Sequence, residues 1–366
     1  MPKEKIKKIY NHLKKWYEKY ERVLLPGTLF FGVIVDIFTF TSININTAFI
    51  ILGLHILFSG SAIYFLNAYD IKFLKKENHI LQFIRLICPL IIQFSFGALL
   101  SASFIFYIFS GSIYVSWPFI LLLIILMISN DVFRKYYLLA RVQISIFFFL
   151  LLSTSSIVLP FILQKLGATI FISSGILALL IILIYILLLN RFTSKDKFNI
   201  KKLAIPIISI FIFINFLYFL NIIPPIPLSL KEAVIGHKIN TANGNYTILV
   251  EKTSLIEKII PGITIHKQKG ESISLYTAIF APGNLKTDIY HDWQHYENKK
   301  WVSYDRFSYS IFGGKKTGFR GYSIKNNLPE GKWRVNIEIE SKQVVGRVYF
   351  NIVEVDIIPE LIEKVK

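Results

Sequence analysis

The chain has 366 residues, of which 54% are hydrophobic and only 17% are charged, and its mean hydropathy is +0.53. Soluble proteins carry about 25% charged residues, so the composition excludes an ordinary soluble domain. The net charge of +18 could indicate a nucleic-acid partner, but the basic residues follow the order of the apolar segments, and we expect no nucleic-acid binding. Cys88 is the single cysteine, which excludes an intrachain disulfide.

Residues 1–22 form a basic leader ahead of the first apolar segment. Its apolar and aromatic residues recur at helical spacing between the lysines: Ile6, Ile9, Tyr10, Leu13, Trp16, Tyr17 and Tyr20. This pattern predicts an amphipathic helix lying on the anionic surface of a lipid bilayer. The alternative is a solvated basic tail with incidental aromatic residues.

Residues 23–223 contain apolar runs of about 20 residues, the length that crosses a bilayer as a helix. Because backbone groups in lipid must be paired internally, each run is predicted to be helical. The fourth run is the shortest and is expected to extend into Asn130 and Asp131. The seven predicted membrane spans are Val23–Ile43, Thr47–Phe65, Cys88–Ser110, Trp117–Ser129, Gln143–Phe161, Thr169–Leu189 and Leu203–Ile222.

The lysines and arginines between these spans lie almost entirely on one side. Twenty of them occur in the leader and in the loops after the second, fourth and sixth predicted spans, whereas the loops on the other side contain only Lys165. Basic loops remain in the cytoplasm. We therefore expect a cytoplasmic N-terminus and, because the number of spans is odd, a C-terminal domain outside the cytoplasm.

Two ionisable residues lie inside predicted spans, where such groups are costly. Asp36 and His55 come at matching distances from the same end of neighbouring antiparallel spans, so they are expected at similar depth. Such a pair could carry a proton or bind an ion, or it could be a buried hydrogen bond that joins two helices. No internal repeat of the kind found in many transporters is evident.

A proline-rich segment, residues 224–232, ends the last span, and residues 233–366 change to the alternation of β-strands. Turn residues separate most of the runs. Eight such strands predict an all-β antiparallel sandwich of immunoglobulin-like kind. The predicted strands are Tyr246–Glu251, Ile263–His266, Ser272–Phe280, Asp288–His295, Trp301–Ile311, Phe319–Lys325, Trp333–Glu340 and Val344–Val355.

An ordered set of short motifs resembles a known family. The motifs are His291-Asp292-Trp293, Gly313-Gly314, Gly318-Phe319-Arg320-Gly321-Tyr322, Gly331-Lys332-Trp333-Arg334-Val335 and Gly346-Arg347. Together they resemble the C-terminal domain of unknown function 2914, closely over residues 276–355. The resemblance implies a bacterial envelope protein, which we place in the cytoplasmic (inner) membrane. It implies no activity and no catalytic residues.

Six residues of the predicted sandwich are candidates for ligand binding: His291, Trp293, Trp301, Arg320, Tyr322 and Arg334. The rings could stack on a ligand, and the two arginines could donate to carboxylate, phosphate or sugar oxygens. The alternative is structural, with Trp293 in the core and Arg320 fixing a turn. His291 and His295 are four residues apart on one strand, about 13 Å, which does not suit a shared metal ion. We expect no metal and no cofactor.

No catalytic motif stands out, so we predict a membrane protein that is not an enzyme. Its function would be to present the sandwich to a cell-envelope protein or glycan. The alternative is a transporter or a lipid-handling enzyme that works through the helices near Asp36 and His55. Nothing in the sequence indicates an oligomeric state.

Overall fold

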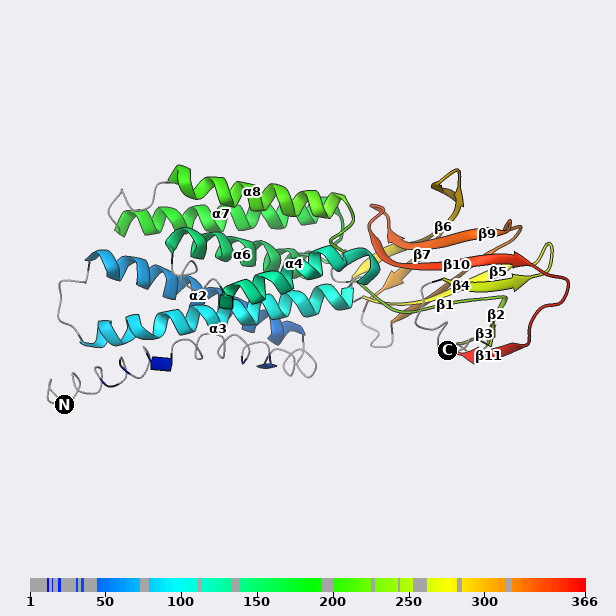
Figure 1. Ribbon diagram of the computed structural model, residues 1–366, viewed down its shortest axis with the longest axis horizontal. Coiled ribbons are helices and arrows are strands. Elements are labelled where there is room, and N and C mark those ends of the chain that lie inside the picture. The colour runs from blue at the N-terminus through cyan, green and yellow to red at the C-terminus, as the bar shows by residue number, and fades with distance from the viewer. Residues whose placement is uncertain are drawn as a thin grey trace. The chain divides into compact units, whose positions relative to one another are not determined.

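The computed structural model describes residues 45–72, 79–110, 113–132, 139–192, 200–224, 228–242, 244–252, 262–281, 285–313 and 318–366, with residues 12, 15, 19, 20, 31, 34 and 35 before them. The chain divides into two compact units, a helical one and a β-rich one that contains Asn221–Lys366. Figure 1 labels their helices and strands.

The described part of the helical unit contains six helices: α2 (Ile45–Lys72), α3 (His79–Ser110), α4 (Ile113–Val132), α6 (Ala140–Leu163), α7 (Ala168–Phe192) and α8 (Ile200–Phe219). All except α4 are long and apolar enough to cross a membrane, while the apolar part of α4 is the shorter segment Ser116–Ser129. Seven spans are therefore not confirmed. Of the predicted first span only residues 31, 34 and 35 are described, and the predicted leader helix lies almost wholly outside the described residues.

Exposed apolar side chains show which helix surfaces face lipid. On α8 they form one stripe with helical spacing: Ile205, Ile208, Ile212, Phe216 and Phe219, each at least half exposed. A soluble bundle would not expose such a stripe to water. The helical unit is therefore a membrane bundle.

Small polar side chains join helices within this bundle. The Ser153 hydroxyl on α6 donates to the Ser103 oxygen on α3 at 2.8 Å, and Ser103 in turn donates to the carbonyl of Leu99 at 2.8 Å. Asn67 on α2 donates to Gln143 on α6 at 3.4 Å. Contacts of this kind are a common means of holding membrane helices together.

The β-rich unit contains eleven strands among the described residues: β1 (Ser229–Gly236), β2 (Lys238–Ala242), β3 (Asn245–Glu251), β4 (Ile263–Lys267), β5 (Ile273–Phe280), β6 (Lys286–Glu297), β7 (Lys300–Phe312), β8 (Phe319–Lys325), β9 (Gly331–Ile339), β10 (Val344–Glu354) and β11 (Leu361–Val365). All eight predicted strands are confirmed. The prediction missed β1, β2 and β11, and β1 begins inside the segment that we predicted to be a linker.

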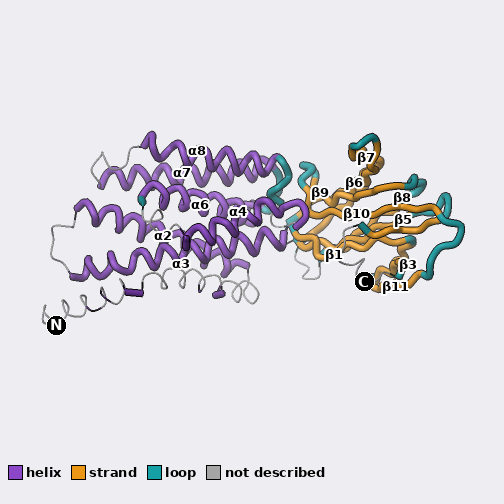
Figure 2. The backbone as a smooth tube through the Cα atoms, in the orientation of Figure 1, coloured by secondary structure: helices purple, strands orange, loops and turns teal. Residues whose placement is uncertain are grey.

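The strands form three layers (Figure 2). The middle sheet has the order β1-β5-β8, and one of its faces packs on the five-stranded sheet β4-β10-β9-β6-β7 through a core built on Leu275, Trp293, Trp333 and Phe350. The other face packs on the sheet β11-β3-β2 through Tyr276 and neighbouring residues. Strand β5 is thus covered on both sides, which explains why nearly all of its residues are buried.

Two features correct the predicted sandwich. The third layer was not expected, because it is built mainly from strands that the alternation did not reveal. The sheet is also not wholly antiparallel, since β4 runs parallel to β10. Strands β4 and β10 are separated in the chain by the five strands β5 to β9, so no hairpin joins them and their pairing is free to be parallel. The immunoglobulin-like kind of sandwich stays a prediction.

Candidate functional site

The five-stranded sheet has two chemically different faces. Apolar side chains of β6, β9 and β10 alternate toward the core, and the positions between them point away from it. We call the second set the outer face, and its residues on four neighbouring strands are Tyr290, Asp292, Gln294, Tyr296, Trp301, Ser303, Arg306, Arg334, Asn336, Glu338, Arg347 and Tyr349. All of them are polar or aromatic, so this surface suits a polar ligand.

A β-bulge brings the β7 side chains onto this face. Gln294 pairs with Ser303, whereas Asp292 pairs with Arg306, so β7 contains one additional residue, Tyr304. The additional residue lets Ser303 and Arg306, which are three positions apart, point to the same side of the sheet. Bulges commonly aim side chains in this way next to functional sites.

One half of the outer face is acidic and already paired. The Arg306 guanidinium donates through Nε and Nη2 to Glu338 Oε1, both at 3.0 Å, and stacks over the Tyr290 ring at 3.9 Å. Asp292 accepts a hydrogen bond from the Ser303 hydroxyl. Burial, and then the nearby Asp292 charge, raises the pKa of Glu338. Glu338 is only 4% exposed and Asp292 only 6%, so these carboxylates underlie the surface and do not project from it.

The other half carries two arginines that are held by neutral groups. Arg334 Nε donates to Gln294 Oε1 at 2.6 Å, and Arg347 Nε donates to Asn336 Oδ1 at 2.6 Å. Within the described part of the chain, neither guanidinium has a carboxylate oxygen within 4.0 Å. Burial lowers the pKa of Arg334, and the neighbouring Arg347 charge lowers it further. Both guanidinium groups are therefore held without a direct carboxylate partner, and the more distant Asp292 charge only partly opposes the lowering of the Arg334 pKa.

Aromatic rings border these arginines. The Arg334 guanidinium lies over the Trp301 ring at 4.5 Å, and Tyr296 and Tyr349 lie 5.0 and 6.1 Å from the same ring between centroids. Arg347 Nη1 donates to the Tyr349 hydroxyl at 3.2 Å. Guanidinium groups bind carboxylates and phosphates through paired hydrogen bonds, and flat rings supply apolar contact. The arrangement can bind an anionic group that is attached to a flat or ring-shaped body.

Two of the six predicted binding residues lie in the core. His291 and Trp293 are fully buried, with Trp293 Nε1 donating to Ser323 Oγ at 3.0 Å. Ser323 Oγ lies 2.8 Å from His291 Nδ1, and Thr277 Oγ1 lies 3.0 Å from His291 Nε2. Every donor finds an acceptor if Ser323 donates to Nδ1 and Nε2–H donates to Thr277, which assigns the Nε2–H tautomer. The structure therefore favours the structural interpretation of both residues.

The remaining four predicted residues lie on two different surfaces. Trp301 and Arg334 belong to the outer face. Arg320 and Tyr322 lie on β8 in the middle sheet, where Arg320 Nη1 donates to the Gly244 carbonyl at 3.3 Å and Tyr322 lies 6.0 Å from Tyr246 between ring centroids. The six candidates therefore do not form one site.

Two further histidines, His237 and His266, contact acidic side chains. His237 Nε2 and His266 Nδ1 both contact Glu251, at 3.2 and 2.8 Å, and His237 Nδ1 lies 3.1 Å from Glu271. No group of three or more side chains suited to a metal ion occurs among the described residues.

The predicted intramembrane pair can be placed only in part. His55 lies on α2, with Nδ1 3.5 Å from Ser95 Oγ and its ring 5.4 Å from that of Phe94. Asp36 lies outside the described residues, so the Asp36–His55 pair stays a prediction.

Residues that the sequence did not single out complete the outer face. Gln294, Asn336, Arg347 and Tyr349 orient or flank the two arginines. The alternation of β9 could have indicated this face, because Arg334, Asn336 and Glu338 occupy the positions between core residues.

The bundle and the sheets define a multi-pass membrane protein with a C-terminal β-rich domain. Residues 286–352, which extend from the start of β6 into β10, match the family described as Protein of unknown function (DUF2914), so the chain carries a C-terminal domain of this family. The outer face lies within the matched segment. No curated protein matches the chain.

Proposed function

We propose that the β-rich domain lies outside the cytoplasm of a bacterial cell and binds an anionic glycan of the envelope through its outer face. The observation that carries the proposal is the pair Arg334 and Arg347, oriented by amide oxygens and left without carboxylate partners among the described residues. Arg334 and Arg347 lie at diagonal positions of β9 and β10, and the Arg347 charge lowers the pKa of Arg334, so a negative group bound beside both would relieve their repulsion.

A sugar fits this face better than a protein. The outward positions of β6 and β9 contain rings, amides, carboxylates and Arg334 but no aliphatic side chains. Protein interfaces have apolar centres that are depleted of charge. Sugars instead present hydroxyls and a flat apolar ring face, which hydrogen-bonding groups and aromatic rings can match.

The orientation is supported by the basic loops. The six described helices together with the predicted span Val23–Ile43 would make seven crossings, which take the chain from a cytoplasmic N-terminus to an external domain. Alkaline phosphatase fused after Lys366 should be active, whereas a fusion near Lys197 should be inactive. An inactive C-terminal fusion whose chain is stably inserted would contradict the external location.

Binding can be tested with the full chain in detergent and short oligomers of galacturonic acid, using their methyl esters as uncharged matched ligands. We expect binding of the acid and at least tenfold weaker binding of the ester, since hydrogen bonds to charged groups contribute about 1.5–3 kcal/mol. Arg334→Gln and Arg347→Gln should each weaken binding by about tenfold or more. The matched control is Arg320→Gln, which removes a partly exposed arginine from β8 and should leave affinity unchanged.

Carboxylate-bearing and phosphate-bearing oligosaccharides should be compared in the same assay, since either group fits two guanidiniums. Failure of every anionic sugar to bind, or an equal loss of binding in the Arg320 variant, would refute the assignment to the outer face.

A further inference from the structure

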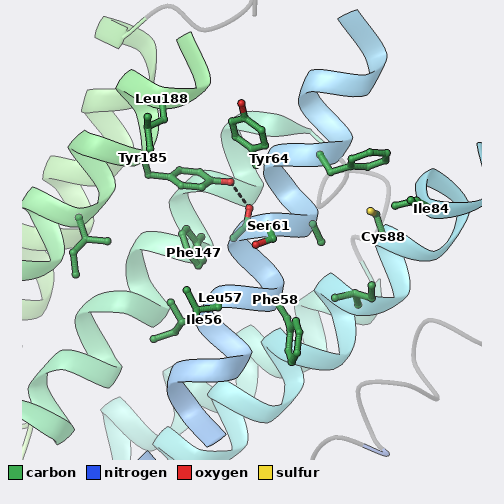
Figure 3. Close-up of a pocket in the computed structure, with 15 residues that line it drawn as sticks. Ile56, Leu57, Phe58, Ser61, Tyr64, Ile84, Cys88, Phe147, Tyr185 and Leu188 are labelled. Carbon is green, nitrogen blue, oxygen red and sulfur yellow. Dashed lines mark hydrogen bonds between the residues drawn. The ribbon is translucent and has the colours of Figure 1, made fainter. Parts of the chain in front are cut away.

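The membrane bundle contains a pocket that is independent of the proposed glycan site. It has a volume of about 670 Å³ and is lined by residues of α2, α3, α6 and α7 (Figure 3). Pockets for small molecules have volumes of about 300–1,000 Å³. All four helices are long and apolar enough to cross a membrane, so the ligand would be reached from within a bilayer.

The lining of the pocket is almost wholly apolar. Carbon side chains cover most of it, including Ile56, Leu57, Phe147, Ile181 and Leu188. The Tyr185 hydroxyl points inward but is already used, because it donates to the backbone carbonyl of Gly60 at 2.7 Å, as the dashed line in Figure 3 shows. The pocket therefore suits a hydrocarbon chain and has little to offer a polar solute.

The inner wall of the pocket is fixed by close packing. A Cβ atom at Gly60 would lie only 3.1 Å from the Phe147 ring, and this ring lies 5.3 Å from that of Tyr185 between centroids. Gly60 thus permits a close approach of the Phe147 ring to α2 that a larger residue would obstruct. On the other side the pocket opens outward, since Leu57 is 65% exposed and Leu188 is 48% exposed. A chain can enter sideways from the bilayer.

Positive charge lies at one end of the pocket. Arg85 follows the lining residue Ile84 on α3, and Arg191 lies three residues after Leu188 on α7, on the same side of that helix. Both arginines are exposed and lie near the ends of the α3 and α7 spans. Basic side chains at this depth attract anionic lipid headgroups.

We propose that this pocket binds one hydrocarbon chain of an anionic glycerophospholipid, whose phosphate lies beside Arg85 and Arg191. The apolar lining binds the hydrocarbon chain, and the two arginines favour an anionic headgroup. The bound lipid would fill the space between α2 and α7 and thereby join two helices that are separate in sequence.

The proposal can be tested with the full chain in lipid nanodiscs. The probes are phosphatidylglycerol and phosphatidylcholine with a photoreactive diazirine in one acyl chain, and the labelled peptides are mapped by mass spectrometry. We expect phosphatidylglycerol to label the peptides that contain Ile56–Phe65 and Ile181–Leu188 more strongly than the exposed stripe of α8. Even labelling of all exposed helix faces, or equal labelling of the pocket by both lipids, would overturn the proposal.

Separate variants test the binding of the acyl chain and the binding of the headgroup. Ser61→Phe places a ring in the pocket and should abolish its labelling, while Ser209→Phe makes the same change at an exposed position of α8 and should not. The double variant Arg85→Gln/Arg191→Gln should lower labelling by phosphatidylglycerol about 25-fold, because each basic residue near an anionic surface contributes about fivefold in affinity. It should leave the weak labelling by phosphatidylcholine unchanged.

If Ser61→Phe does not fold, Ile181→Phe narrows the same pocket from α7 and should give the same loss of labelling. Pocket labelling that stays at the wild-type level in a folded Ser61 or Ile181 variant would refute the proposal that the acyl chain lies in this pocket. Wild-type preference for phosphatidylglycerol in the double arginine variant would refute the role of the arginines.

Discussion

Acid should destabilise the β-rich domain mainly through His291. This imidazole is fully buried between two sheets, and burial lowers its pKa from the ordinary 6.5 to about 3. The unfolded chain then binds a proton that the folded chain excludes. The stabilising contribution is therefore complete above pH 6.5 and is lost as the pH falls from 6.5 toward 3.

The expected size of the effect follows from this interval. A full proton difference corresponds to about 1.36 kcal/mol per pH unit, and the unfolded imidazole is half protonated at pH 6.5, so lowering the pH from 6.5 to 4.5 should reduce the free energy of unfolding by about 2.3 kcal/mol. A typical domain is stable by only about 5–15 kcal/mol, so the change is measurable. Urea unfolding of the full chain in detergent can be followed by tryptophan fluorescence, to which Trp293 and Trp333, both buried in the core, contribute.

The test variant is His291→Gln. His291→Gln lowers stability at every pH, because the hydrogen bonds to Ser323 and Thr277 are altered, but it should remove most of the slope between pH 6.5 and 4.5. An unchanged slope in the His291 variant would show that its exclusion of a proton does not control acid stability.

Further predictions concern packing. Gly321→Ala should destabilise the domain by about 1–3 kcal/mol, because the new Cβ would lie 2.3 Å from the Tyr309 ring; urea unfolding measures this loss, and a neutral result would mean that the ring can move. Gly236→Ala should lower the urea midpoint as well, since its Cβ would lie 2.4 Å from the Leu249 carbonyl of the third layer. In the bundle, a double-mutant cycle of Ser103→Ala and Ser153→Ala in thermal unfolding should show a coupling of about 0.6–2 kcal/mol, and a coupling near zero would contradict the hydrogen bond between α3 and α6.

Alternation and turn residues were sufficient to predict the strands that have one face in the core. Trp333, Val335 and Ile337 alternate with polar residues in β9, and this strand was predicted to within a few residues. Strands β2 and β11 lie in the outer three-stranded layer and are largely exposed, so their sequences lack a clear alternation of apolar and polar residues. The parallel pairing of β4 with β10 joins strands that are far apart in the chain, which local sequence does not encode.

The outer face was harder to predict. Its residues come from four strands, and they become neighbours only through the register in which these strands pair. Trp301 and Arg334 were singled out as residues that could bind a ligand, but their contact depends on the pairing of β6 with both β7 and β9. His291 and Trp293 have the same residue types as a binding surface and differ only in the direction in which they point. Burial, and not residue type, assigns them to the core.

Because β5 is covered on both sides, the unit that folds is larger than the segment that identifies the family. Residues 286–352 contain β6 to β9 and most of β10 but lack β1 and β5, whose side chains cover Trp293, Trp333 and Phe350. Expressed by itself, that segment would present this apolar surface to water and would be prone to aggregate. A fragment for biochemical work should begin at or before Ser229 and retain β11, so that all three layers can close.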